Sequence, residues 1–227
     1  LSTIERHNAW IDDPSDNTVK RVYGGDLQGG VWRFDIDSLV GPLQSAQLLA
    51  RLQIDESTPQ PITTKPVLMD ANGKVAVIVG TGRYLSSADV ASTTQQSVYA
   101  LKDSLTNTGI SDVRNNNTLV RQTFTVSGDT ASISDTPVNW ATKNGWWVDF
   151  PSEHSGERMA VDMVMQFGTL SIATAIPASS DPCKPGGPSW RYYLNASNGN
   201  ALDNPAGELW SGNSLIVGQS WVKPRPA

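Results

Sequence analysis

Side chains able to do chemistry gather at one place in this sequence. The stretch Ser152-Glu153-His154-Ser155 brings together the hydroxyl, carboxylate and imidazole groups that a charge-relay hydrolase uses. Neighbouring residues of one loop cannot adopt the relay geometry, and the sequence has no Gly-x-Ser-x-Gly elbow. The stretch therefore predicts an exposed polar turn and not a hydrolase site.

Groups that bind metals or phosphates are also scarce. The chain has 2 histidines, His7 and His154, which offer almost nothing to a zinc site. Its single cysteine, Cys183, fits a packed loop side chain, a free thiol or a partner elsewhere in a longer chain. The glycine-rich stretch 24–30 predicts a turn between strands and not a phosphate cradle, because no helix follows it.

The composition indicates one folded domain spanning residues 1–227. Hydrophobic residues make up 38% of the chain and charged residues 17%, which is enough apolar material for a sizeable core. A net charge of −5 without a basic run makes nucleic acid and anionic membranes poor partners. The chain shows no transmembrane stretch, and its first ten residues lack a signal peptide's layout. If the protein is exported, its signal lies outside this chain.

The elements that would position side chains read as strands. Short β-branched or aromatic runs, each bounded by Gly, Asp, Asn or Pro, predict an all-β sandwich, barrel or propeller. These runs are 21–23, 30–34, 75–79, 97–101, 123–126 and 169–174. Residues 37–53 are the one helix candidate, and Gly41-Pro42 interrupts it near its start, so a buried strand fits Leu48, Leu49 and Leu52 equally well.

A weak repeat favours propeller blades. Residues 22–37 form one unit, 75–103 a second and 163–199 a third. In each unit a strand enters a glycine turn, and a later strand carries an aromatic residue and ends in Asp or Asn. Such hairpins cannot bury their own faces, so the repeat predicts sheets that stack around an axis.

The tryptophans fit this interpretation. Five of the 8, namely Trp32, Trp140, Trp190, Trp210 and Trp221, stand beside strand-like runs and are expected mostly to pack between blades. Trp146 and Trp147 are adjacent, so alternation along a strand directs their rings to opposite faces. We expect a neighbouring blade to cover the outer ring, although an exposed contact is the alternative.

Three segments carry a resemblance to a known family. VYGGDLQGGVWRFDI (22–36) resembles a blade motif of the type IV pilus tip-associated adhesins of the PilY/PilC type. So do PITTKPVL with the later VIVGTGRYLS and QSVYALKDS, and the stretch 145–187 with its Gly-Trp, Gly-Glu-Arg and Asp-Pro-Cys elements. The match runs in the family's order from about Asp12 to Gly199. The resemblance implies a modified β-propeller, of which this chain looks like the C-terminal part.

The resemblance also implies a function. Members of the family promote pilus assembly, adhere at the pilus tip and control retraction through calcium, so we expect no enzymatic activity. Implied partners are minor pilins or other pilus-tip subunits, a host or surface receptor, and an upstream part of the same polypeptide. The implied location is the cell surface or pilus tip, with outer-membrane association or periplasmic transit after export.

The family's calcium loop has the form Asp-x-Asp-x-Asp-Gly-x-x-Asp and precedes the Val-Tyr motif. The resemblance places Asp12 and Asp16 as carboxylate ligands here and Thr18 as the residue whose main-chain carbonyl coordinates. Pro14 stands at the second acidic position and Lys20 at the last. Calcium takes about 6–8 oxygen ligands, and carboxylate count tunes its affinity. We therefore expect a degenerate loop that binds calcium weakly or not at all.

Two rival functions share the expected fold. A quinoprotein-type propeller dehydrogenase also uses Gly-Asp-x-x-Gly-x-x-Trp blades, but one cysteine excludes its vicinal disulfide and no calcium ligand set is evident. A carbohydrate-binding propeller lectin would suit exposed Trp and Asn loops, and glycan binding through Trp146 or Trp147 would distinguish it.

Blade counting predicts a partial propeller. A blade motif occurs by Val22 with no blade before it, so an open arc would leave apolar faces in water. We expect upstream sequence or a contacting subunit to complete the ring. Alone, the chain is expected to self-associate or to melt without cooperativity.

Overall fold

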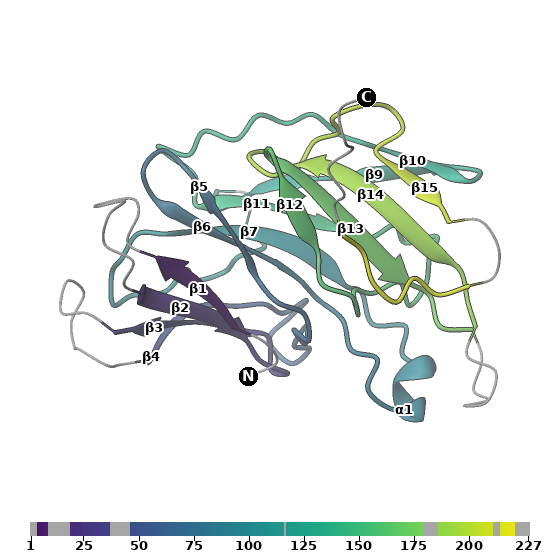
Figure 1. The fold of residues 1–227 in the computed structure, drawn as a ribbon, viewed down its shortest axis with the longest axis horizontal. Coiled ribbons are helices and arrows are strands. Elements are labelled where there is room, and N and C mark those ends of the chain that lie inside the picture. The colour runs from purple at the N-terminus through teal and green to yellow at the C-terminus, as the bar shows by residue number, and fades with distance from the viewer. Residues whose placement is uncertain are drawn as a thin grey trace, which may run out of the picture.

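The structure is a computed structural model, and it is an all-β fold (Figure 1). It describes residues 4–8, 19–36, 46–115, 117–178, 186–210 and 214–220, with side chains from residue 19 onward. Across these ranges the strands form three sheets, none of which closes on itself, and the helix α1 (Ser87–Val90) is a single turn. The all-β prediction is confirmed.

Each sheet begins as a four-stranded antiparallel meander. The first sheet has the order β1 (Ile4–Asn8), β2 (Val19–Gly25), β3 (Gly30–Asp35) and β4 (Ala46–Arg51). β4 lies within the helix candidate of the sequence, so the strand alternative is confirmed for Leu48 and Leu49.

The second sheet follows the same plan and gains one strand. Its order is β5 (Val67–Asp70), β6 (Val75–Gly80), β7 (Ser97–Asp103), β11 (Gly145–Asp149) and β8 (Val120–Gln122). β8 pairs with β11 in parallel, whereas the other neighbours are antiparallel.

The third sheet is a meander extended by a hairpin. Its order is β12 (Val164–Gln166), β13 (Thr169–Ala175), β14 (Ser189–Asn195), β15 (Gly207–Leu209), β10 (Thr130–Ile133) and β9 (Phe124–Ser127). The hairpin β9–β10 comes from the long connection between β7 and β11, so one insertion contributes to two sheets.

The three repeat units of the sequence fall in three different sheets. Their hairpins are β2–β3, β6–β7 and β13–β14, which occupy the second and third places of successive meanders. The weak sequence repeat therefore corresponds to a structural repeat, in which the same hairpin occurs at the same place in each meander.

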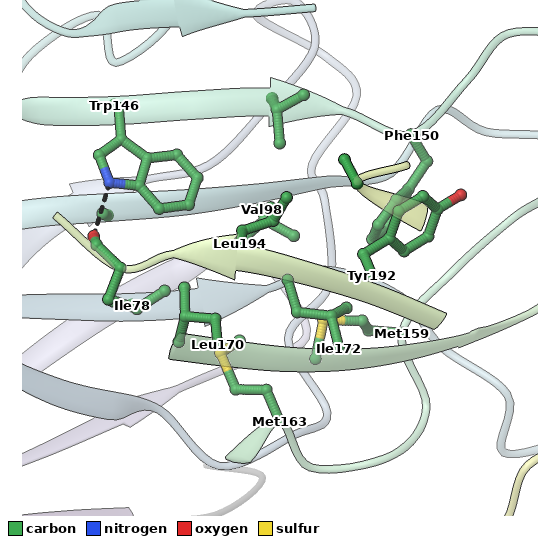
Figure 2. Packing of buried hydrophobic residues seen from close by; sticks show 14 of the residues in the cluster. Ile78, Val98, Trp146, Phe150, Met159, Met163, Leu170, Ile172, Tyr192 and Leu194 are labelled. Carbon is green, nitrogen blue, oxygen red and sulfur yellow. Dashed lines mark hydrogen bonds between the residues drawn. The ribbon is translucent and has the colours of Figure 1, made fainter. Parts of the chain in front are cut away.

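The second sheet lies between the other two and buries both of its faces (Figure 1). Along β6, Val75, Val77 and Val79 face the first sheet, while Ala76 and Ile78 face the third. Figure 2 shows the second of these two layers, in which Ile78 and its neighbours meet Leu170 and other residues of the third sheet. A strand covered on both sides reads as a continuous apolar run, as 75–79 does.

The adjacent tryptophans occupy opposite layers. Trp146 is fully buried against the third sheet, and its indole N–H donates to the Ala196 carbonyl at 2.9 Å (Figure 2). Trp147 is 3% exposed and packs against the first sheet. Neighbouring sheets therefore cover both rings, and the alternative of an exposed outer ring is excluded.

The other tryptophans differ in burial. Trp140 and Trp190 are buried, Trp32 is half-buried, and Trp210 is 36% exposed. Trp221 and Cys183 lie outside the described residues.

The connections between sheets cross close to the preceding hairpin in the same way twice. After the first meander, the Ile62 N–H donates to the Asp26 carbonyl, and the Ile62 side chain fills the space above Gly25. After the second, the Met159 N–H donates to the Thr81 carbonyl, and its side chain covers Gly80. A Cβ at Gly25 would lie 2.3 Å from Ile62 Cγ2, and one at Gly80 would lie 1.8 Å from Met159 Sδ. Glycine at these two positions lets the chain cross close to the preceding hairpin.

The close crossing at Gly80 predicts the effect of adding one methyl group there. Gly80→Ala forces the Met159 side chain from its place and is expected to lower the free energy of unfolding by about 1–3 kcal/mol. Chemical denaturation followed by tryptophan fluorescence measures the change. Gly218→Ala, whose Cβ meets nothing within 4 Å, is the control and should stay within about 0.5 kcal/mol of the parent. Met159→Ala removes both buried packing and the clash, so the double variant should lose less stability than the two single losses added together. An additive double variant would contradict the crossing.

Candidate functional site

The residues expected to bind calcium cannot be placed. Asp12, Asp16, Thr18 and Pro14 lie outside the described residues. Lys20 is the second residue of β2, and its carbonyl accepts the Ile36 N–H at 2.9 Å, as a sheet residue does. In the described part of the chain, no group of three His, Cys, Asp or Glu residues could hold a metal ion. The ligand set rests on the sequence, where Pro14 and Lys20 do not fit it.

The polar stretch 152–155 does not assemble a relay. The Ser152 hydroxyl donates to Glu153, and both side chains are exposed. His154 Nδ1 lies 2.8 Å from Glu157 Oε2, and its ring packs against Trp190 in a tilted arrangement with 4.2 Å between centroids. The His154 imidazole therefore has Glu157 as its acidic partner, whereas the Ser152 hydroxyl is bound to Glu153 and not to the imidazole. The polar-turn prediction agrees with this geometry.

The glycine-rich stretch forms the β2–β3 turn around Asp26. Its carboxylate accepts the N–H groups of Gln28 and Gly30 at 2.8 Å each, and the Trp32 indole N–H at 2.6 Å. Burial raises the pKa of Asp26, but these three hydrogen bonds outweigh it and lower the pKa below its ordinary value. The Gly-Asp and Trp of the blade motif thus shape one turn.

A buried polar junction connects the first and second sheets. The Arg33 guanidinium lies at the end of β3 and donates to Asp35 Oδ1 at 2.9 Å and Asp103 Oδ1 at 2.8 Å. The Tyr23 hydroxyl donates to Asp103 Oδ2 at 2.8 Å. These four side chains are at most 1% exposed. Asp35 and Asp103, which end β3 and β7 in the first two repeat units, therefore both bind Arg33.

The electrostatics of this junction follow from its burial. Arg21 Nε lies 3.6 Å from Asp35, so among the described residues two arginines face two aspartates. Burial, and then the charge of Asp103, raise the pKa of the Tyr23 hydroxyl well above its usual range, so it remains a donor. An isolated charge at such depth is strongly destabilising, so each member requires the others.

A second junction lies in the segment between β11 and β12, where Glu157 connects to the third sheet. Its carboxylate accepts the hydroxyl of Thr174 at 2.5 Å and that of Tyr192 at 2.7 Å, besides contacting His154. Glu157 is 2% exposed. Burial first, and the charge of Glu157 second, raise the pKa of the Tyr192 hydroxyl well above its usual range.

Arg158 continues this junction with main-chain contacts. Its guanidinium donates to the carbonyls of Gly156, Arg83, Asp89 and Ser92, so it fastens the loop between β6 and β7. The Gly-Glu-Arg element of the sequence is therefore an anchor, in which Glu157 and Arg158 connect to different sheets.

The insertion between β7 and β11 changes sheets at a single residue. β8 ends at Gln122 and β9 begins at Phe124. The fully buried Gln122 amide donates to the carbonyls of Thr136 and Asn198, both at 2.7 Å, and its oxygen accepts from Ser134 at 2.6 Å. The side chain thereby connects the second sheet to the third.

Sequence reasoning missed these junction residues as a set. Arg33, Asp35 and Asp103 stood out only as strand ends, and Gln122 had no signal at all. The one available hint was the recurrence of an acidic or amide residue at the end of each unit.

The fold and its junctions define a class of all-β domain, in which successive meanders stack face to face. No protein-family model matches the chain. It is 28% identical over 242 aligned positions to the type IV pilus biogenesis factor PilY1 of Pseudomonas aeruginosa strain UCBPP-PA14. It is 32% identical over 200 positions to a PilY1 homolog of Xylella fastidiosa, and both alignments cover 83% of the chain. The chain is homologous to the C-terminal domain of PilY1.

A solved structure supports the fold. The crystal structure of the Pseudomonas aeruginosa PilY1 C-terminal domain matches 92% of the chain with a TM-score of 0.73 at 22% identity. The chain spans 54% of that domain, and only 21% and 15% of the two curated relatives. Over its described residues the chain has no helix with the length and apolar character that crossing a bilayer demands.

The first junction yields a test of its importance. Arg33→Met leaves Asp35 and Asp103 buried without their shared cation, and should lower the free energy of unfolding by about 3–5 kcal/mol. Arg51→Met, which removes an exposed arginine bound to the Gln28 carbonyl, is the matched control and should change it by less than about 1 kcal/mol. Equal effects in urea denaturation would contradict the junction.

Proposed function

We propose that the chain is part of a type IV pilus biogenesis factor and acts there as a structural, non-enzymatic domain. The observation that carries this proposal is the similarity to PilY1 along 83% of the chain, joined to the shared fold. The buried charges support it, because Arg33, Glu157 and Arg158 are all engaged in connecting sheets.

The same proposal includes the shape of the whole domain. The three sheets would be successive blades of a modified propeller, to which residues 1–227 contribute one part. In support, the meanders stack face to face, and the solved domain is nearly twice as long as the matched part. The first sheet also has a half-buried apolar face turned away from the second, with Val22 paired to Phe34 and Trp32 to Leu48. Another blade would cover this face.

Location and partners follow from the proposed role. The protein would be exported and displayed at the cell surface or pilus tip, after periplasmic transit or with outer-membrane association. Its partners would be minor pilins or other tip subunits, further sequence of the same polypeptide, and a surface or host receptor to which it adheres.

The two rival functions find less support. The Gly-Asp and Trp that a quinoprotein blade shares are engaged with each other through Asp26 and Trp32. The lectin alternative relied on exposed rings at Trp146 or Trp147, and both are buried.

Removal of the gene tests the proposed role. In the bacterium that encodes the chain, deletion should reduce pili sheared from the cell surface several-fold, while the total pilin in cell lysates stays unchanged. The parent sequence and Arg51→Met should restore surface pili, and Arg33→Met should not, because it destabilises the domain. Normal surface pili in the deletion strain would refute the role.

Calcium titration tests the degenerate loop. Because Pro14 and Lys20 replace two carboxylates, calorimetry should detect no site tighter than the roughly millimolar class of extracellular modules. Lys20→Asp restores one anionic ligand and should tighten binding measurably. A micromolar site in the parent chain that Asp16→Ala abolishes would contradict this expectation.

A further inference from the structure

A small cavity lies where loops of the first and second sheets meet, and none of the proposed roles uses it. Its volume is about 300 Å³, and its walls come from the β2–β3 turn, the segment after β4 and the loop between β6 and β7. We call it the Arg83 cavity, and the residues that matter for its chemistry are Leu27, Pro59, Arg83, Asp89, Gln96 and Arg158.

The cavity carries an excess of positive charge, and hydrogen bonds hold its charged side chains in place. Its charged lining residues are Arg83, Arg158 and Asp89, two cations against one carboxylate. Asp89 receives the main-chain N–H groups of Leu85 and Ser86 as well as Arg83 Nε at 2.6 Å. Burial raises the pKa of Asp89, but these hydrogen bonds outweigh it and lower the pKa, so the carboxylate stays charged.

Arg83 retains capacity for a ligand. Its side chain is 48% exposed, and its hydrogen bond to Asp89 uses Nε alone. The two terminal nitrogens form the planar fork that binds a carboxylate through two parallel hydrogen bonds. Arg158, by contrast, already donates to four carbonyls and contributes charge without a free fork.

Gln96 supplies an independent sign of a ligand. Its side chain lines the cavity and is 5% exposed, and its Nε2 donates to the Thr94 carbonyl at 3.2 Å. Its Oε1 is buried and accepts no hydrogen bond. A buried acceptor without a donor is destabilising, so a ligand that offers an N–H or O–H group would relieve this cost.

We propose that the Arg83 cavity binds an acidic residue, Glu or Asp, on an exposed segment of a partner protein. The carboxylate pairs with the Arg83 fork. Gln96 Oε1, which is buried in the free chain, accepts a main-chain N–H of the same segment once the Gln96 side chain turns toward the cavity. The aliphatic stem of the residue lies against Leu27 and Pro59. The volume is at the lower limit of ligand pockets, which suits one inserted side chain better than a whole small molecule.

Other anions fit this lining less well. A phosphate at neutral pH offers few donors to Gln96 Oε1. A uronic acid has both a carboxylate and hydroxyl donors, but none of the residues lining this described cavity is aromatic, so a sugar ring finds no face on which to stack.

Titration of the full chain with small probes tests the proposal by NMR. N-acetyl-glutamate N-methylamide carries the carboxylate and main-chain N–H groups, and its glutamine analogue lacks only the charge. The first should shift the Arg83 Nε–H and Gln96 side-chain amide signals and saturate in the millimolar range. The glutamine analogue, and the first probe against Arg83→Gln, should bind at least about 10-fold more weakly.

Two further variants complete the design. Gln96→Met removes the acceptor and should also weaken binding, whereas Arg191→Gln removes an arginine that contacts Glu208 and Trp210, away from the cavity, and should leave the affinity unchanged. The proposal is wrong if both probes bind equally, if Arg83→Gln has no effect, or if no signals shift at tens of millimolar. Tighter binding of galacturonate would assign the cavity to acidic sugars instead. None of these outcomes bears on the pilus role, which the deletion strain tests separately.

Discussion

The second sheet buries both of its faces, and alternate residues along β6 therefore face two different apolar layers. Val77 packs toward the first sheet and Ile78 toward the third, so neither outer sheet can be removed without placing one complete layer in water. The close crossings at Gly25 and Gly80 serve this arrangement, because they bring each new meander directly onto the previous one.

Stacked sheets also bring strand ends together, and the polar groups there must find partners away from water. Arg33 meets this need between the first and second sheets. The adjacent Glu157 and Arg158 meet it between the third sheet and the β6–β7 loop of the second. A buried ion pair such as that of Arg33 adds little net stability over apolar packing, but removing one partner leaves the other charge buried and unpaired. An arrangement of the sheets that separates Arg33 from Asp35 and Asp103 is therefore disfavoured.

The sequence predicted the local structure well because strand periodicity and turn residues act locally. The runs at 75–79 and 97–101 became β6 and β7, and the alternation at Trp146 and Trp147 correctly indicated opposite faces. The long-range pairs could not be predicted. Arg33 and Asp103 are 70 residues apart, and Gln122 connects two sheets through carbonyls that carry no side-chain signature. The calcium ligands remain a prediction, since Asp12, Asp16 and Thr18 lie outside the described residues.

The change of sheet at Thr123 has a consequence for the order of folding. The hairpin β9–β10 closes within ten residues and can form quickly. The strand β15, which pairs with the other edge of β10, is made much later, since Thr130 pairs with Glu208. During synthesis the β10 edge of the hairpin therefore stays unpaired until β15 of the third meander has been made. Its Thr125 and Ser127 side chains are exposed and polar, which keeps one face of that waiting hairpin hydrated and limits premature association with other chains.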